Sequence, residues 1–171
     1  MTRHMVMILA ASLFVVCVAS SVQAHVKPQG PPTLSQGYIV FHVKDDDKDK
    51  DSTETISVLA GQYRIGNKDN AGSGIRWPDQ TDITPIYFDN IDKGIEPSDC
   101  DQIHVDINHS TVGNDNFKFA FTVVLIFTDG TTFTYEHPDT ITQTKNDGHG
   151  SWDVKKSQLR AAKLWRQTRT K

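Results

Sequence analysis

The strongest constraint on the fold is an alternating apolar stretch at residues 117–127. Phe117, Phe119, Phe121, Val123 and Leu125 occupy every second position, and Val124 and Ile126 add apolar side chains to the opposite face. A repeat of two is the period of a β-strand, not of a helix. Apolar residues on both faces of the second half indicate a central strand that is covered on both sides there.

Shorter segments repeat the same pattern along the chain. Asp129-Gly130 separates the long strand from residues 131–135, and Asp-Gly between β-rich segments predicts a hairpin. Pro85 makes residues 83–88 an edge strand, because proline cannot donate a hydrogen bond to a sheet. The other predicted strands cover residues 38–43, 53–59, 63–65, 102–108 and a short piece around Ile141. This pattern predicts an all-β fold, an antiparallel β-sandwich domain spanning residues 37–143.

The N-terminal 24 residues have the features of a secretory signal peptide. Arg3 precedes a short apolar run, and small residues around Val22-Gln23-Ala24 predict cleavage after Ala24. We therefore expect a secreted or periplasmic protein with no transmembrane segment in its mature chain. Residues 25–36 contain three prolines and predict an extended arm. Only Cys100 remains after cleavage, so no disulfide framework is expected.

The C-terminal part, residues 144–171, changes character. Residues 144–151 predict a linker, and an amphipathic helix is predicted from Trp152 to Lys171. Val154, Leu164 and Trp165 fall on its apolar face, and lysines and arginines fall on the other. The helix either packs on the sandwich or binds an anionic lipid or acidic partner through its basic face. Its small apolar face favours packing.

The second unusual stretch is an acidic loop at residues 44–51. Its five aspartates are interrupted by Lys48 and Lys50. Alternating aspartates resemble the start of an EF-hand, but Lys50 stands at the glycine position and Ile56 at the position of the bidentate glutamate. Two interpretations stay open: a calcium site, and a solvated loop whose charge is offset by its own lysines.

Residues 38–61 and 103–117 resemble parts of PLAT/LH2 domains. The first segment has an alternating strand, an Asp-rich loop and a second strand closing on Gly61; the second has a strand, the Gly113 turn and Phe117. The usual Thr-Gly-Asp and Ala-Gly-Thr sequences of that family are absent. The resemblance implies an eight-stranded sandwich, akin to C2 domains, that binds lipid surfaces or proteins, often through calcium held in its end loops. It implies candidate calcium ligands at Asp46, Asp47, Asp49 and Asp51, joined by Asn114 and Asp115 if that turn lies at the same end.

Histidines offer a different metal site. Cleavage after Ala24 would expose His25, whose amine and imidazole together are a copper-binding group, with His104 and His109 as further candidate ligands. Ordinary exposed strand histidines are the simpler interpretation. Neither a Gly-x-Ser-x-Gly sequence nor a P-loop is present.

The net charge of −3 does not indicate a nucleic-acid binder. The sequence therefore predicts a secreted, non-catalytic binding module for a surface or protein partner, with calcium dependence left open. A copper-binding protein using His25 is the alternative, and a small secreted enzyme is the third hypothesis.

Overall fold

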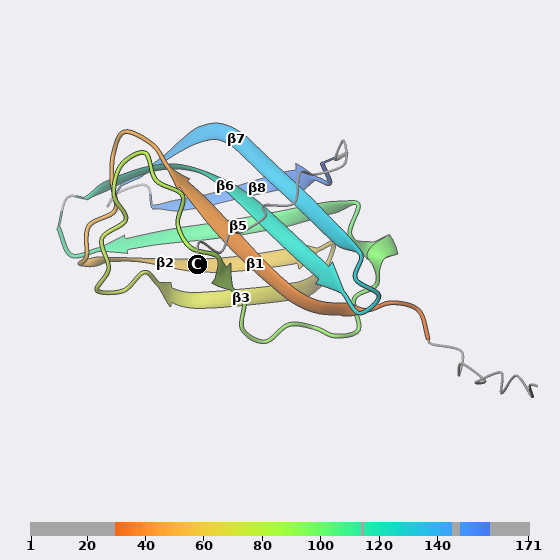
Figure 1. Cartoon of the computed structure of the whole chain (residues 1–171). Coiled ribbons are helices and arrows are strands. Elements are labelled where there is room, and N and C mark those ends of the chain that lie inside the picture. Colours follow the sequence, from red (N-terminus) through yellow and green to blue (C-terminus); the bar gives the residue numbers. More distant parts are fainter. Residues whose placement is uncertain (1–29, 114, 145–147, 158–171) are drawn as a thin grey trace, which may run out of the picture.

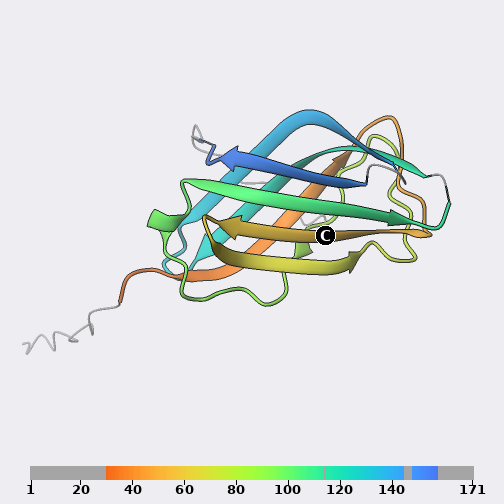
Figure 2. The ribbon, with the colours of Figure 1, turned by 180° about the vertical axis from the view of Figure 1, so that it is seen from behind.

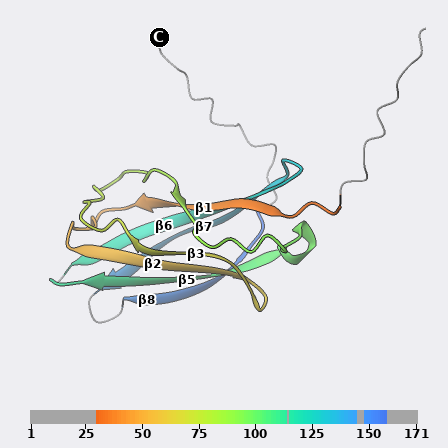
Figure 3. The same ribbon diagram turned by 90° about the horizontal axis from the view of Figure 1, so that it is seen from below.

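Two four-stranded antiparallel sheets pack face to face (Figure 1). The structure, a computed structural model, describes residues 30–113, 115–144 and 148–157. One sheet has the order β4-β1-β6-β7 and the other β3-β2-β5-β8. The strands are β1 (Leu34–Val43), β2 (Ser52–Ala60), β3 (Tyr63–Ala71), β4 (Ile86–Tyr87), β5 (Gln102–Thr111), β6 (Asn116–Phe127), β7 (Thr132–Thr144) and β8 (His149–Lys155). The two layers are separate in Figure 3, and the second sheet faces the viewer in Figure 2. The predicted sandwich-like, nearly all-β fold is confirmed.

Alternate residues of the paired strands fill the space between the sheets. Phe41 of β1 pairs with Phe121 of β6 in one sheet, and Ile56 of β2 pairs with Ile107 of β5 in the other. These side chains are at most 1% exposed. Burial of such side chains contributes about 1.5–3 kcal/mol each. β6 is a central strand as predicted, because it pairs with both β1 and β7. On its outward face, Val124 is buried and Ile126 is partly buried.

The predicted hairpin after β6 is present. Gly130 has φ of 86°, a conformation that favours glycine, and β7 pairs with β6 along nearly its whole length. β7 continues to Thr144 and does not end near Tyr135. Its pairing with β6 shifts register between Phe119 and Phe121, opposite the part of β7 that contains Pro138, and then continues. The predicted short strand around Ile141 is therefore the second half of β7.

The C-terminal prediction is wrong for the residues that the structure describes. Residues 149–155, predicted to be linker and helix start, form β8 beside β5. Val154 pairs with Ile103 and Trp152 with Val105. The free edge of β5 offers main-chain hydrogen bonds to a neighbouring strand, and this outweighs the weak helical pattern of so short a segment. Residues 158–171, the rest of the predicted helix, lie outside the described residues.

The segment between β3 and β5 closes one side of the sandwich. β4 pairs with β1 at an edge, as Pro85 predicted, and Asp89 bridges to Asn67 of β3. The one described helical element is a short 3-10 turn, Pro97–Asp99. In the described part of the chain, no helix is long and apolar enough to span a membrane. Residues 1–29, with the predicted signal peptide and most of the arm, are outside it; β1 begins at Leu34, inside the predicted arm.

Candidate functional site

The acidic loop is organised around the side chain of Lys48. Its ammonium nitrogen donates to four main-chain carbonyl oxygens, those of Asp49 at 2.9 Å, Ser52 at 2.6 Å, Gly72 at 2.9 Å and Ile75 at 3.1 Å. Lys48 is fully buried. A cage of carbonyl oxygens around a positive charge is the arrangement that metal-binding loops use, and here a lysine supplies the charge.

Trp77 and Gly72 complete this cage. The Lys48 ammonium lies 4.9 Å from the centre of the Trp77 ring, and the two residues also exchange main-chain hydrogen bonds. Gly72 has φ of 70°, and a Cβ there would come within 2.4 Å of the Trp77 ring. Trp77 in turn packs against Phe41 of the core, with ring centres 5.1 Å apart. The cage therefore ties the acidic loop to residues 72–77 and to the core.

Cations of the chain lie beside two of the four predicted calcium-binding aspartates. Asp47 pairs with Arg76, and Asp46 lies 3.9 Å from the ammonium of Lys118. Asp49 and Asp51 are exposed. Across residues 30–113, 115–144 and 148–157, no group of three or more histidine, cysteine or acidic side chains is placed to hold a metal ion.

The turn before β6 lies beside the acidic loop. Asp115 Oδ2 accepts hydrogen bonds from the main-chain N–H of Asp49 at 3.0 Å and from the Ser52 hydroxyl at 2.5 Å. Asp115 thus anchors the loop through its main chain instead of joining the other carboxylates around an ion. Asn114 lies outside the described residues.

Below the loop, Glu54 of β2 and His109 of β5 form a buried pair; the sequence indicated His109 only as a candidate copper ligand and did not indicate Glu54. They are opposite each other in the sheet register, and His109 Nδ1 lies 2.7 Å from Glu54 Oε1. Neither side chain is exposed. His109 Nε2 is 3.8 Å from Asp115 Oδ2, and neither it nor Glu54 Oε2 has a hydrogen-bond partner among the described residues.

Burial dominates the chemistry of this pair. It raises the pKa of Glu54 from 4.5 to about 7, and the hydrogen bond and charge of His109 oppose the increase. A local signal existed in the sequence. Glu54 lies an even number of positions from the inward Ile56 and Val58, so its side chain points to the same face of β2. His109 likewise lies two positions after the inward Ile107 of β5.

The two predicted copper ligands that the structure describes, His104 and His109, are not brought together. His104 and His109 project from opposite faces of β5, since five positions separate them. His104 points outward, with Nδ1 2.8 Å from Asp153 and Nε2 3.2 Å from Asp106. The hydrogen bond to Asp153 raises the pKa of His104. His25 lies outside the described residues, and the copper hypothesis stays a prediction.

The buried cluster contains a serine, a histidine and carboxylates but not the geometry of a nucleophile beside its base. The Ser52 hydroxyl donates to Asp115, and His109 uses its Nδ1 for Glu54. A serine nucleophile needs its hydroxyl hydrogen-bonded to the base and open to substrate, and Ser52 is fully buried. The described hydrogen bonds of Ser52 and His109 therefore join neighbouring strands and loops and do not pair a hydroxyl with a base.

An open groove lies beside the cage. Its volume is about 410 Å³, and its walls include Ile75, Arg76, Trp77, Pro78, Ile83 and Ile86. Ile75 is 59% exposed. We call this feature the Ile75 groove. It combines apolar walls with the Arg76–Asp47 ion pair at its rim.

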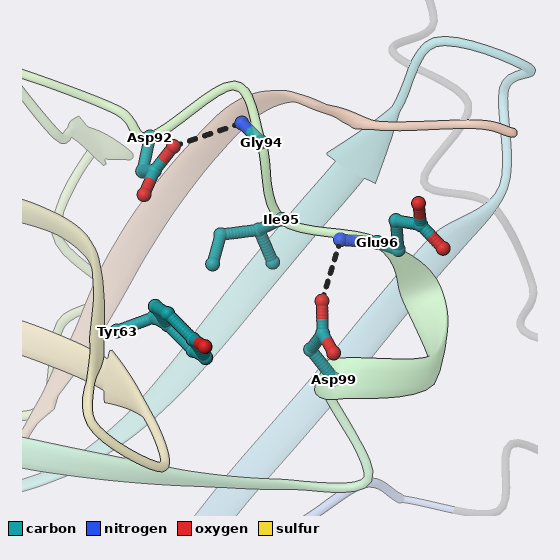
Figure 4. A pocket seen from close by; sticks show the side chains of 6 residues that line it. All are labelled: Tyr63, Asp92, Gly94, Ile95, Glu96 and Asp99. Carbon is teal, nitrogen blue, oxygen red and sulfur yellow. Dashed lines mark hydrogen bonds between the residues drawn. The ribbon is translucent and has the colours of Figure 1, made fainter. Parts of the chain in front are cut away.

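A second cavity, of about 380 Å³, lies by the turn between β2 and β3 (Figure 4). It is lined by Tyr63, Ile95 and three carboxylates. Two of these bond to their own loop: Asp92 accepts from the N–H of Gly94 at 2.8 Å, and Asp99 from the N–H of Glu96 at 2.9 Å. These carboxylates stabilise the turns on which they lie.

In comparisons with known proteins, no family model and no curated sequence matches this chain.

Proposed function

We propose that this protein is a secreted, non-catalytic binding module that recognises a protein or surface partner through the Ile75 groove. One observation carries the proposal: a large aliphatic side chain, 59% exposed, stands at an apolar groove on a loop that is held in place. Exposed apolar side chains beside a groove with a polar rim are typical of interaction sites.

The loop that carries Ile75 is fixed by main-chain hydrogen bonds. The carbonyl oxygen of Ile75 accepts a hydrogen bond from the Lys48 ammonium, and the N–H of Ile75 donates to the carbonyl oxygen of Gly72 at 3.1 Å. The N–H of Gly74 donates to the carbonyl oxygen of Lys50 at 3.0 Å. A surface that is already ordered loses less conformational entropy when a partner binds. This favours recognition by the groove over a purely structural role for the loop.

The resemblance to PLAT/LH2 domains supports the same function class, and the two four-stranded antiparallel sheets agree with that resemblance. The proposed groove differs in one respect from the binding sites of calcium-dependent PLAT/LH2 domains. Lys48 supplies the positive charge between the acidic loop and residues 72–75, so we propose that the groove is formed without calcium.

The test compares Ile75→Ser with the matched variant Tyr63→Ser, since Tyr63 is 53% exposed on another surface. Immobilised wild-type and variant proteins are incubated with secreted proteins, and separately with phosphatidylcholine vesicles with and without phosphatidylserine. We expect the immobilised Ile75→Ser protein to retain at least about tenfold less than wild type of either a secreted protein or the vesicles, because removing an apolar anchor costs at least about 1.4 kcal/mol. Tyr63→Ser should retain as much as wild type. Equal retention by all three proteins contradicts the proposal.

A further inference from the structure

The outer face of the β4-β1-β6-β7 sheet carries a chain of three hydrogen-bonded side chains. His42 of β1 lies between Asp82 and Thr122 of β6: its Nδ1 is 2.8 Å from Asp82 Oδ1, and its Nε2 is 2.8 Å from Thr122 Oγ1. We propose that these residues form an acyl-accepting site, in which Thr122 is the nucleophile, His42 is its general base and Asp82 positions the histidine. The substrate class is a small ester of a short-chain carboxylic acid.

The period of the strands places the nucleophile and its base on this face. Phe41 and Phe121, which directly precede His42 and Thr122, point into the core and are at most 1% exposed. The side chains that follow them therefore point away from the core. β1 and β6 are neighbours in the sheet (Figure 1), and their register makes His42 and Thr122 diagonal neighbours on the outer face. Asp82 bridges to His42 across the other side of β1.

The carboxylate determines which nitrogen of His42 can act as a base. An ionised carboxylate only accepts hydrogen bonds, so the Nδ1 that faces Asp82 carries the proton. The Nε2 of the neutral imidazole then has no proton and accepts the hydrogen bond of the Thr122 hydroxyl. A hydroxyl bonded to an unprotonated imidazole nitrogen, with a carboxylate on the other nitrogen, is the arrangement that activates hydroxyl nucleophiles.

A cavity gives a substrate access to the Thr122 hydroxyl. Thr122 is partly exposed, in contrast to the buried Ser52. The cavity has a volume of about 290 Å³, and its walls include His42, Thr122, Lys44 and Glu136. This volume is close to the lower end of small-molecule sites, which limits the substrate to a small ester. Lys44 brings a positive charge to the same cavity, and such a charge stabilises the oxyanion that forms when a carbonyl group is attacked.

The proposed step transfers one acyl group to the protein. Thr122 Oγ1 forms a bond to the carbonyl carbon of the ester while the hydroxyl proton passes to His42 Nε2. The bond between that carbon and the leaving oxygen then breaks, and the leaving alcohol takes the proton from Nε2. The products are an ester of Thr122 and one alcohol, so the step consumes no other reactant and returns His42 to its starting state.

The acyl-accepting site adjoins the Ile75 groove, because Asp82 lines that groove as well. The site takes up one acyl group and needs no turnover, so it adds to the proposed binding function and does not replace it. It does not rest on that function either. Ile75→Ser, the variant that should weaken partner binding, should accept the acyl group as fast as wild type.

Acetylation of the intact protein by p-nitrophenyl acetate tests the site. Peptide mass spectrometry after brief exposure at neutral pH locates the acetyl groups, and hydroxylamine cleaves the ester expected on Thr122 but not the amides formed on lysines. Thr132 is the internal control, an exposed threonine of the same sheet whose hydroxyl donates to the carbonyl oxygen of Gly130. We expect Thr122 to react at least about 100-fold faster than Thr132, because a positioned general base contributes about 10²–10⁴-fold.

Three substitutions assign the roles. His42→Gln removes the base and should lower the rate at Thr122 by about 100-fold, whereas Thr122→Ser keeps a hydroxyl and should still be acetylated. Asp82→Asn should lower the rate by about tenfold or more, and Asp82→Glu should recover part of it without a matching change in thermal stability.

The result in wild type decides the proposal without relying on any variant to fold. Absence of an ester on Thr122, or equal rates at Thr122 and Thr132, overturns it. Unchanged acetylation of Thr122 in a folded His42→Gln protein overturns it as well, because the hydroxyl would then react without its base.

Discussion

At the scale of single residues, Lys48 joins the acidic loop to residues 72–75 by donating to carbonyls of both segments. We expect Lys48→Met, which keeps most of the volume but removes the donor, to lower the free energy of unfolding by about 3 kcal/mol or more, because buried carbonyls lose their partner. Urea unfolding of wild type and variant measures the change.

Lys50→Met is the matched control for that prediction, since Lys50 is exposed two positions further along the same loop. It also removes one positive charge from the loop, but it should change the free energy of unfolding by no more than about 0.5 kcal/mol. Equal effects of the two substitutions would mean that the charge of the loop matters and that the cage does not.

At the scale of elements, strands were predictable where apolar residues alternate and not where polar residues alternate. β1, β5 and β6 carry large inward side chains at every second position. The predicted bounds of β5 and β6 lie within three residues of those observed, whereas β1 begins four residues before its predicted start. β3 and β8 are mostly polar and lie at sheet edges, where pairing with β2 and β5 makes them strands. Such pairing comes from the main chain of a neighbour, which a local pattern does not reveal.

β8 therefore provides the sharpest test of the second sheet. Val154 is 5% exposed and points into the core opposite Ile103, whereas the adjacent Lys155 points outward. We expect Val154→Asp to lower the free energy of unfolding by about 3 kcal/mol, because it buries an unpaired carboxylate, and Lys155→Asp to change it by about 0.5 kcal/mol or less. Thermal unfolding followed by near-ultraviolet circular dichroism measures both. A similar loss in the two variants would show that β8 is not packed with this alternation.

At the scale of the whole molecule, the sequence identified the unusual loop and left open what neutralises it. Lys48 was recognised as an alternative to calcium, but its partners Gly72 and Ile75 lie 24 and 27 residues further along the chain. The Glu54–His109 pair spans 55 residues and needs the register of β2 against β5. Residue parity was visible in the sequence, whereas the register that places these groups together depends on the assembled sheets.

Addition of calcium tests whether the chain's own cations take the place of a metal ion in the acidic loop. The loop is anchored by Lys48, by the Asp47–Arg76 pair and by Asp115, so an added ion would have to displace cations that belong to the chain. We expect about 5 mM calcium to leave the unfolding temperature within about 1 °C of its value in EDTA, because a ligand stabilises only the state that it binds. Lys48→Gln is the informative comparison. It leaves the carbonyl oxygens and carboxylates in place while removing the internal cation, and calcium should stabilise this variant more than wild type. Strong stabilisation of the wild-type protein would restore the calcium-dependent interpretation of the loop and contradict the proposed role of Lys48.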